Sequence, residues 1–322
     1  MQLWVGSVRI TTRIGGVAFV GLLFLAPGGA GAQQAAVPRG DWYPQLVTSV
    51  DVYGQSGQFN TGNLNNAHLY GARAYDVALG VRLGEHLMIA FRGQEAWTNA
   101  SLTLAPQTIN VHSRSYGVRT LVDVGWFDWD TTASVGFNDN STSIPDFFGG
   151  PPTIGIWHGR EWAVVSTVGA KVPVGFLVVE PRAGARVNAL HDEGYTAGFF
   201  FVPDQFRSTT TWLGQAKISA PIHLDQYGIL TPWIAGEVSR TNNPHPPLGF
   251  LTDLTGMAGG HYVFNVPELE GPGAFPGQTW RTASAGLRLD VTPSFIMDGS
   301  VTFSTNDLGS WLGYRWNAVV KF

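Results

Sequence analysis

The chain has 322 residues, of which only 13% are charged, and it contains 12 Trp, 19 Phe, 9 Tyr and 41 Gly. Its formal net charge of −4 provides no basic footprint for a nucleic-acid partner. The absence of cysteine excludes disulfide bonds and Cys-based metal sites.

The first 32 residues have the pattern of a signal peptide. Two arginines precede the apolar stretch 14–26, and small residues then lead to Ala32, so we expect cleavage between Ala32 and Gln33. The apolar stretch ends at Pro27, short of the roughly 20 residues of a transmembrane helix. No later segment approaches 18 consecutive apolar residues. The mature chain is therefore predicted to be either secreted and soluble or embedded in a membrane as strands.

The mature chain alternates between two kinds of residue. In residues 69–83 the odd positions are mostly apolar and the even positions are small or charged, which is the period of a strand between two environments. The same pattern recurs at 127–138, 177–188 and 282–291. Twelve strands are predicted, near 46–54, 68–83, 86–97, 111–124, 127–138, 160–173, 176–190, 208–221, 227–240, 279–292, 294–304 and 310–322.

The connections between these strands alternate strictly between short and long. The short joins lie at 84–85, 125–126, 174–175, 223–226 and 293. The long joins lie at 55–67, 98–110, 139–159, 191–207 and 241–278. An even strand number with short periplasmic turns and long extracellular loops is typical of bacterial outer-membrane barrels. The predicted fold class is therefore all-β: a transmembrane antiparallel up-and-down β-barrel over 46–322, preceded by a short segment, 33–45.

The last predicted strand carries an assembly signal. Its apolar face contains Tyr314 and Trp316 and ends at the C-terminal Phe322. A terminal aromatic residue on such a strand is what the barrel-assembly machinery recognises, so we expect that machinery and outer-membrane lipid as partners, and the outer membrane as the location.

Charges of both signs fall on the polar face of the predicted strands. One interpretation is a ladder of mutually neutralising pairs that packs the lumen, which the cost of an isolated charge favours. The other is a polar lining for water, ions or a passing chain. The predicted lumen-facing charges are Asp76, Arg82, Arg92, Arg119, Asp123, Asp128, Asp130, Lys171, Glu180, Arg182, Arg186, Lys217, Glu237, Arg288, Asp290 and Arg315.

From Leu46 to Phe322 the sequence resembles the autotransporter β-domain, the translocator of type V secretion. The segment 75–84 resembles the family's strand before a Leu-Gly turn, and 179–186 followed by 191–194 resembles its central strand with a proline. Residues 230–233 resemble a later Leu-Thr-Pro-aromatic strand start, and 313–316 resemble the closing strand. The resemblance implies a barrel of about twelve strands that serves secretion.

The sequence departs from the family pattern in two places. Only residues 33–45 precede the first predicted strand, and they contain Pro38 and Pro44, so neither a passenger nor a long luminal helix is expected there. Asn317 stands where the family's closing strand often has glycine.

Other candidate sites have simpler interpretations. Asn65-Asn66 resembles an autotransporter cleavage point but lies after a strand, where a turn is expected. The triplet His191-Asp192-Glu193 and the lone His245 lack the spacing of metal ligands. No hydrolase elbow, zinc-protease motif or P-loop is present. We therefore expect neither enzymatic activity nor a metal or cofactor.

Several functions remain open at this point. The chain is predicted to be a translocator-type barrel whose passenger is absent or encoded elsewhere, a pore for small solutes, or a surface adhesin that acts through its loops. The loop 241–278 is rich in proline and glycine and also apolar, so we expect it to fold over or into the barrel mouth.

Overall fold

The computed structural model describes residues 44–61, 66–84, 86–102, 108–145, 150–197, 200–202, 204–224, 227–242, 278–305 and 309–322. The expected signal peptide, Asn65, His245 and most of the loop 241–278 lie outside these residues. Within the described part of the chain, no helix has the length and apolarity needed to cross a membrane.

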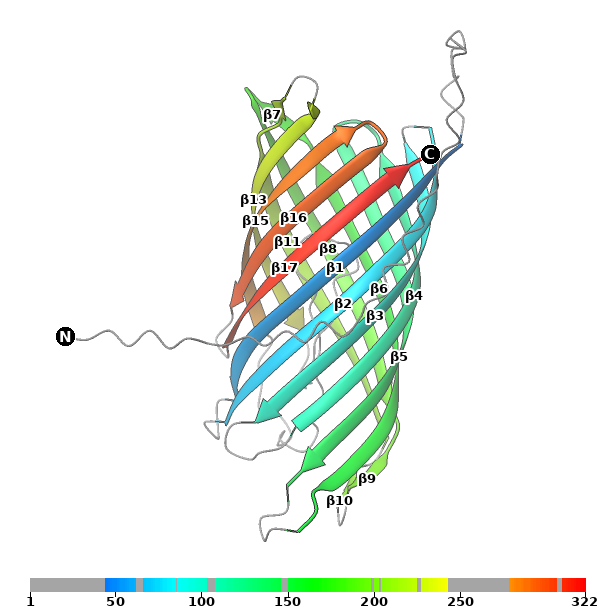
Figure 1. Ribbon diagram of the computed structural model, residues 1–322, viewed down its shortest axis with the longest axis vertical. Coiled ribbons are helices and arrows are strands. Elements are labelled where there is room, and N and C mark those ends of the chain that lie inside the picture. The colour runs from blue at the N-terminus through cyan, green and yellow to red at the C-terminus, as the bar shows by residue number, and fades with distance from the viewer. Residues whose placement is uncertain are drawn as a thin grey trace, which may run out of the picture. The chain divides into compact units, whose positions relative to one another are not determined.

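Twelve long strands form one antiparallel sheet that closes on itself, as the sequence predicts (Figure 1). Each strand pairs with its neighbour in the chain, β8 pairs with β11, and the last strand pairs with the first. The strands are β1 (Pro44–Thr61), β2 (Asn66–Leu83), β3 (Leu87–Leu102), β4 (Thr108–Asp123), β5 (Phe127–Ile144), β6 (Thr153–Ala170), β8 (Leu177–Asp192), β11 (Gln205–Ser219), β13 (Ile229–Asn242), β15 (Gln278–Thr292), β16 (Phe295–Thr305) and β17 (Gly309–Lys321).

Four short strands extend the hairpins at the two ends of the barrel. At the end with short turns, β7 (Val172–Val174) pairs with β8, and β12 (Ile222–His223) pairs with β13. At the opposite end, β9 (Tyr195–Ala197) pairs with β10 (Phe200–Val202). Tyr195 stacks on Trp157 of β6 with 4.4 Å between ring centroids, so this hairpin is held against the barrel wall.

The short turns depend on glycine. Gly84 and Gly175 have φ values of 62° and 63°. This left-handed region is accessible to glycine without the steric penalty that a Cβ brings. The strands on either side can therefore reverse direction within a few residues, which explains why the short joins were visible in the sequence.

The predicted strands are all present, but several run further towards the long loops than predicted. β1 continues to residue 61 rather than 54, and β5 continues to residue 144 rather than 138. A tilted strand needs only about 9–11 residues to cross the hydrocarbon core, and β5 has 18. Beyond the core both faces of a strand are polar, so the alternation ends while the hydrogen-bond ladder continues.

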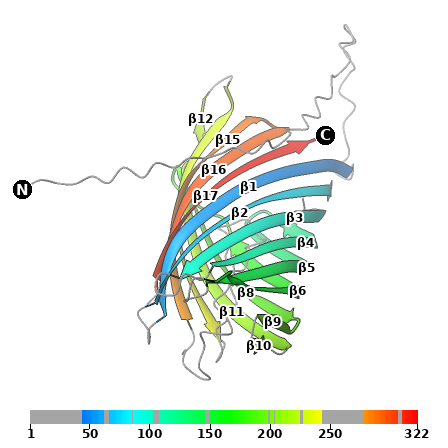
Figure 2. The same cartoon turned by 60° about the horizontal axis from the view of Figure 1, so that its bottom comes forward.

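The outward side chains are large, apolar and exposed. Contiguous apolar surface on this scale does not occur on ordinary water-soluble monomers, whereas lipid covers it on a membrane barrel. Figure 2 shows the strands arranged around the barrel axis, so these side chains surround the barrel. Examples with more than 45% exposure are Val50, Val52, Val77, Leu79, Phe91, Val164, Ile234, Leu287, Val301 and Trp316.

Aromatic residues mark the boundary of this apolar belt on the side of the long loops. On β2, the outward Tyr75 is followed two positions nearer the loop by Arg73. On β6, Trp162 is followed in the same way by Arg160. Aromatic girdles at both interfaces are characteristic of membrane barrels, so the apolar belt ends at this level and polar strand segments extend beyond it.

The aromatic residues of the closing strand lie over glycines of its neighbours. A Cβ added at Gly54 of β1 would lie 2.6 Å from the Tyr314 hydroxyl, and one added at Gly299 of β16 would lie 2.7 Å from the Trp316 ring. Aromatic side chains that cover a glycine on the next strand compensate for its missing side chain. Tyr314 and Trp316 therefore cover both junctions of β17.

Replacing Trp316 with arginine should impair assembly of the barrel. The side chain is 62% exposed on the lipid face, and a basic residue there costs about 2–4 kcal/mol near the bilayer midplane. The measurement is the outer-membrane level of folded barrel, detected by its altered gel migration without heating.

Asn317→Arg is the matched control for this substitution. Asn317 is adjacent in sequence but lies on the inner face, opposite Asp51 and Asp298. An arginine at this position should therefore leave the outer-membrane level of folded barrel almost unchanged. Equal levels of the two variants would contradict the assignment of the two faces.

Candidate functional site

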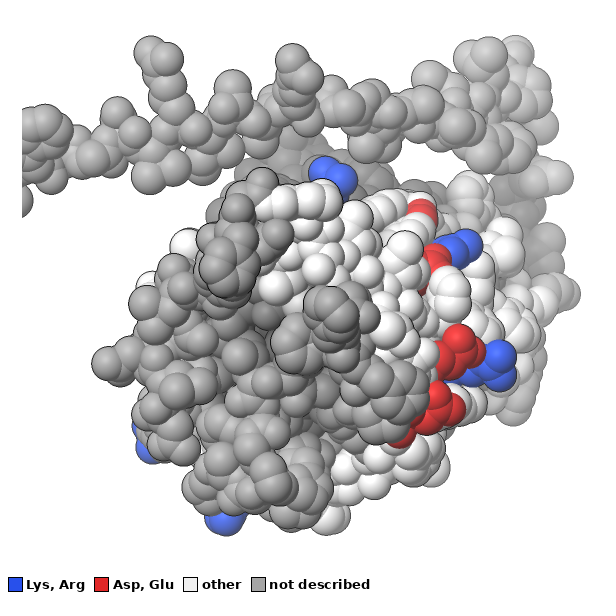
Figure 3. Space-filling model, turned by 90° about the horizontal axis from the view of Figure 1, so that it is seen from below, with Lys and Arg blue, Asp and Glu red and all other residues white. Residues whose placement is uncertain are grey.

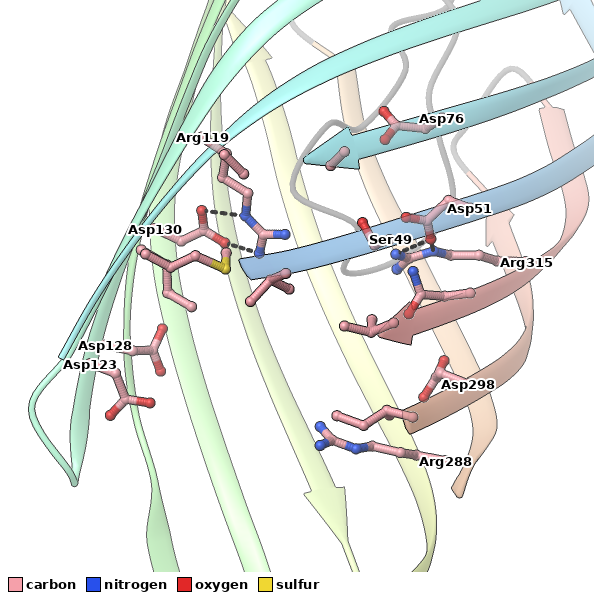
Figure 4. Close-up of a pocket in the computed structure, with 18 of the residues that line it drawn as sticks. Ser49, Asp51, Asp76, Arg119, Asp123, Asp128, Asp130, Arg288, Asp298 and Arg315 are labelled. Carbon is pink, nitrogen blue, oxygen red and sulfur yellow. Dashed lines mark hydrogen bonds and ion pairs between the residues drawn. The ribbon is translucent and has the colours of Figure 1, made fainter. Parts of the chain in front are cut away.

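The inner face of the barrel encloses a cavity of about 380 Å³ in the half near the short turns (Figure 4). Its lining comes from strands all around the barrel wall. The charged side chains that line it are Asp51, Asp76, Arg92, Arg119, Asp123, Asp128, Asp130, Lys171, Arg182, Lys217, Arg288, Asp298 and Arg315. Six are acidic and seven are basic, so the lining is close to electrically neutral.

The structure brings most of the predicted lumen charges into this lining. Eleven of the sixteen line the cavity, and the other five lie on the same inner face at other positions. Of these five, Glu180 lies opposite Lys217, Asp290 pairs with Arg288, and Arg186 and Glu237 are 5% and 8% exposed. The fifth of these residues is Arg82, which is half-buried.

Two lining residues were missed at the sequence level. Asp51 lies between two valines of β1, and Asp298 follows Met297 on β16. Both therefore had the alternating pattern that identified the other charges. The signal was present in the sequence, and a period-two count through these two strands would have found them.

The ion pairs around the cavity run along the wall. Arg92 of β3 pairs with Asp76 of β2 at 2.5 Å, and Arg119 of β4 pairs with Asp130 of β5 at 2.5 Å. These pairs join strands that are direct neighbours in the sheet. In each pair the two opposite charges neutralise each other close to the barrel wall, and neither side chain reaches across the lumen.

The same geometry holds where the barrel closes. The Arg315 Nε of β17 donates to Asp51 Oδ1 of β1 at 2.7 Å, and Lys217 of β11 lies 3.4 Å from Glu180 of β8. Figure 4 shows the Arg119–Asp130 and Arg315–Asp51 pairs on different parts of the wall, with cavity between them. Each of these four pairs joins adjacent strands, so none of the four narrows the lumen by bridging it.

Two further pairs span one intervening strand. Arg182 of β8 donates to Asp128 of β5 across β6, and its other terminal nitrogen donates to Thr167 of β6 at 3.0 Å. Lys171 reaches Asp123 at 2.6 Å in the same way at the short-turn rim. These pairs connect strands that share no backbone hydrogen bonds.

Gly169 creates the space for the Arg182–Asp128 pair. A Cβ at residue 169 would lie 3.0 Å from the Arg182 Nη2 and 3.1 Å from the Asp128 Oδ2. The charged groups therefore pass directly over a position without a side chain. Both are well covered, with side-chain exposures of 10% for Arg182 and 4% for Asp128.

Asp298 has a different kind of partner. The Trp233 indole N–H donates to its Oδ2 at 3.1 Å, and the ammonium group of Lys217 lies 5.6 Å from the centroid of the Trp233 ring. One tryptophan therefore contacts an anion at its edge and a cation at its face, the arrangement that the ring quadrupole favours.

A second polar region lies on the outer face, beyond the apolar belt. Arg73 lies over Trp97 at 5.4 Å, and Trp97 stacks on His112 at 5.3 Å between centroids. Asp139 accepts from Arg114 at 2.5 Å and contacts His158 at 3.0 Å. Figure 3, from the loop end, shows acidic and basic side chains in contact along one side. Arg73, His112, Arg114 and His158 of this region therefore all have protein partners.

The other candidate sites do not form chemical centres. His191 lies outward and Asp192 inward at the end of β8, and the nearest acid to His191 is Asp204 at 3.8 Å. Among the residues that the structure describes, no group of three or more His, Asp or Glu side chains could hold a metal ion. The predicted assembly residues Tyr314, Trp316 and Phe322 are all exposed on the outside, at 53%, 62% and 68%.

Several solved structures share the fold of this barrel. The chain is similar to the translocator domain of the autotransporter NalP from Neisseria meningitidis, with a TM-score of 0.66 and 14% identity over 86% of this chain and 88% of that one. It is similar to the β-domain of the Bordetella autotransporter BrkA, with a TM-score of 0.63 and 13% identity over 86% and 100%. It is also similar to the transport unit of AIDA-I from Escherichia coli, with a TM-score of 0.51 and 9% identity over 89% and 93%.

No protein-family model and no curated protein matches the sequence. At these identities the likeness concerns the fold. The chain has the fold of autotransporter translocator domains, a closed barrel of twelve strands, as the sequence resemblance predicted.

Replacing Asp128 with asparagine should destabilise the barrel markedly. The substitution leaves the covered Arg182 guanidinium without its anion, and breaking a buried pair in this way costs about 3–5 kcal/mol. Urea unfolding in lipid vesicles, followed by tryptophan fluorescence, measures the change in the free energy of unfolding.

Asp290→Asn removes an equivalent charge from a more open pair. Arg288 and Asp290 have side-chain exposures of 44% and 24%. The free energy of unfolding should therefore fall by less than about 1 kcal/mol. A loss for Asp128→Asn as small as that for Asp290→Asn would contradict a structural role for the pair across β6.

Proposed function

We propose that this protein is a bacterial outer-membrane barrel of the translocator type, with a lumen that serves as a polar passage. One observation carries the proposal: the ion pairs around the lumen cavity join adjacent or next-adjacent strands. Charges paired in this way are neutralised at the wall, and a cavity of about 380 Å³ remains between them.

The alternative interpretation, in which the charges pack the lumen, needs a different geometry. Packing would require side chains from opposite walls to meet at the barrel axis. The Arg92–Asp76, Arg119–Asp130 and Arg315–Asp51 pairs instead hold long side chains close to their own strands. A polar, nearly neutral lining suits water and a moving polar chain, since neither sign of charge dominates it.

The outer membrane is the location that the outer surface supports. The apolar belt fits a hydrocarbon core, and the aromatic boundary fits a membrane interface. Short turns on one side and long loops on the other fit a periplasmic and an extracellular end. In this orientation, β1 begins on the periplasmic side and β17 ends there.

An extended polypeptide is the cargo that the fold likeness supports. The similar barrels of NalP and AIDA-I are described as a translocator domain and a transport unit. The role we assign to this chain is passage rather than chemistry. A pore for small solutes is the second candidate, because the neutral lining would also suit uncharged polar molecules.

Conductance through planar lipid bilayers tests the passage. Ser49 lines the cavity, and a tryptophan at this position would project into it. We expect Ser49→Trp to lower single-channel conductance roughly twofold or more, because conductance falls as the lumen narrows. The matched control is Val50→Trp on the lipid face of the same strand, which should leave conductance unchanged.

A grafted epitope separates translocation from solute flow. An unstructured epitope inserted between residues 36 and 37 should become accessible to protease on intact cells if the barrel passes a polypeptide. The Ser49→Trp variant should reduce that exposure. Conductance without epitope exposure would favour the solute pore. A barrel that assembles but neither conducts nor exposes the epitope would refute the passage and favour recognition through the loops.

A further inference from the structure

An apolar groove of about 480 Å³ lies on the outer face of the barrel, over β8, β11 and β13. Its floor is formed by Ala183, Ala185 and Gly214, and its sides by larger groups that include Trp212 and Val238. Arg240 also lines it, next to Trp212 in register and on the loop side of Val238. The groove is therefore apolar along its length and cationic at its loop-side end.

A second arginine lies beside this cationic end. Arg281 of β15 is directly opposite Val238, two positions from Arg240, and both arginines are exposed on the outer face. On β13, Arg240 follows the apolar outward residues Val238, Gly236 and Ile234. The two arginines therefore lie on neighbouring strands, diagonal to each other in the register, where the apolar belt ends.

Among the described residues of β8, β11, β13, β15 and β16, no acidic side chain takes an outward position beside these two arginines. The acidic residues that the structure describes on β8, β11, β13, β15 and β16 all occupy inner-face positions: Glu180, Asp192, Glu237, Asp290 and Asp298. On the opposite side, by contrast, the outward Arg114 pairs with Asp139 at 2.5 Å. A pair of cations at a lipid boundary, with no anion on the described strands around it, is complementary to an anionic lipid headgroup.

We propose that this groove binds lipopolysaccharide of the outer leaflet, with a lipid A phosphate on Arg240 and Arg281 and an acyl chain in the groove. Arginine presents a planar fork of donors that matches phosphate oxygens in a bidentate geometry. An acyl chain fills the space over Ala183, Ala185 and Gly214, where it gains contacts with the walls. The assignment rests on the proposed outer-membrane orientation, because the arginines lie at the loop side and lipopolysaccharide occupies that leaflet.

Native mass spectrometry of the intact barrel tests the site. The protein, purified from membranes, is titrated with bisphosphorylated lipid A and, separately, with phosphatidylglycerol. Wild-type protein should bind one lipid A tightly and phosphatidylglycerol more weakly. The double variant Arg240→Gln/Arg281→Gln should weaken lipid A binding about tenfold or more, because two charge-assisted contacts are lost. Arg114→Gln, at a paired arginine of the same boundary, should leave it unchanged.

A separate substitution tests the acyl-chain part of the proposed site. A Cβ at Gly214 meets no atom within 4 Å, so the backbone there has room for a side chain, and Gly214→Leu places one in the groove. It should weaken lipid A binding while the barrel still folds, as judged by gel migration. The control Gly93→Leu lies elsewhere on the lipid face, where an added Cβ meets only the Tyr116 ring at 3.8 Å.

The results of these experiments test the lipid A site separately from the proposed passage through the lumen. Unchanged lipid A binding in Arg240→Gln/Arg281→Gln, or an equal loss in Arg114→Gln, overturns the site. Phosphatidylglycerol that binds as tightly as lipid A overturns the assignment to lipopolysaccharide. Conductance and epitope exposure should be normal in the groove variants, so a failure of the passage leaves the lipid A result readable on its own.

Discussion

The closed hydrogen-bond ladder is the constraint on which the rest of this structure depends. Hydrocarbon offers no partner to a backbone N–H or C=O, so a sheet can span it only without free edges. Here β17 meets β1 along thirteen residue pairs, from Val47 with Lys321 to Phe59 with Gly309. Closure separates every strand into a face towards lipid and a face towards the lumen. The period-two pattern of the sequence follows directly from that separation.

The lumen shows how the inner face satisfies its charges. Because the wall is curved and tilted, side chains on adjacent strands meet more easily than side chains on opposite walls. Arg119 and Asp130 lie on adjacent strands, two residues out of register, so both point into the lumen. Small residues extend this reach by one strand, since Gly169 lets Arg182 pass over β6 to Asp128. Neutralisation at the wall and an open centre are therefore two consequences of the same geometry.

The sequence predicts the parts of this structure that are local in the chain. Twelve strands, the tight turns and most of the lumen charges follow from alternation and from glycine positions such as Gly84. The pairing of charges could not be predicted in the same way. The Arg182–Asp128 contact joins residues 54 apart and depends on a glycine in the strand between them. The strand ends beyond the lipid belt were also missed, because the alternation disappears where both faces are polar.

The two sides of the outer surface differ in a way that only the register reveals. On β2 to β6 the strands extend past the apolar belt, and cations there stack on Trp97 or pair with Asp139. On β13 and β15 the arginines at the belt's edge have no such partners among the residues that the structure describes, and the wall below them is indented by Gly214 and Ala183. If lipid A supplies the anion for Arg240 and Arg281, as proposed above, this side of the barrel has a preferred lipid contact. The outer face would then recognise a specific lipid as well as border the membrane, independently of what the lumen passes.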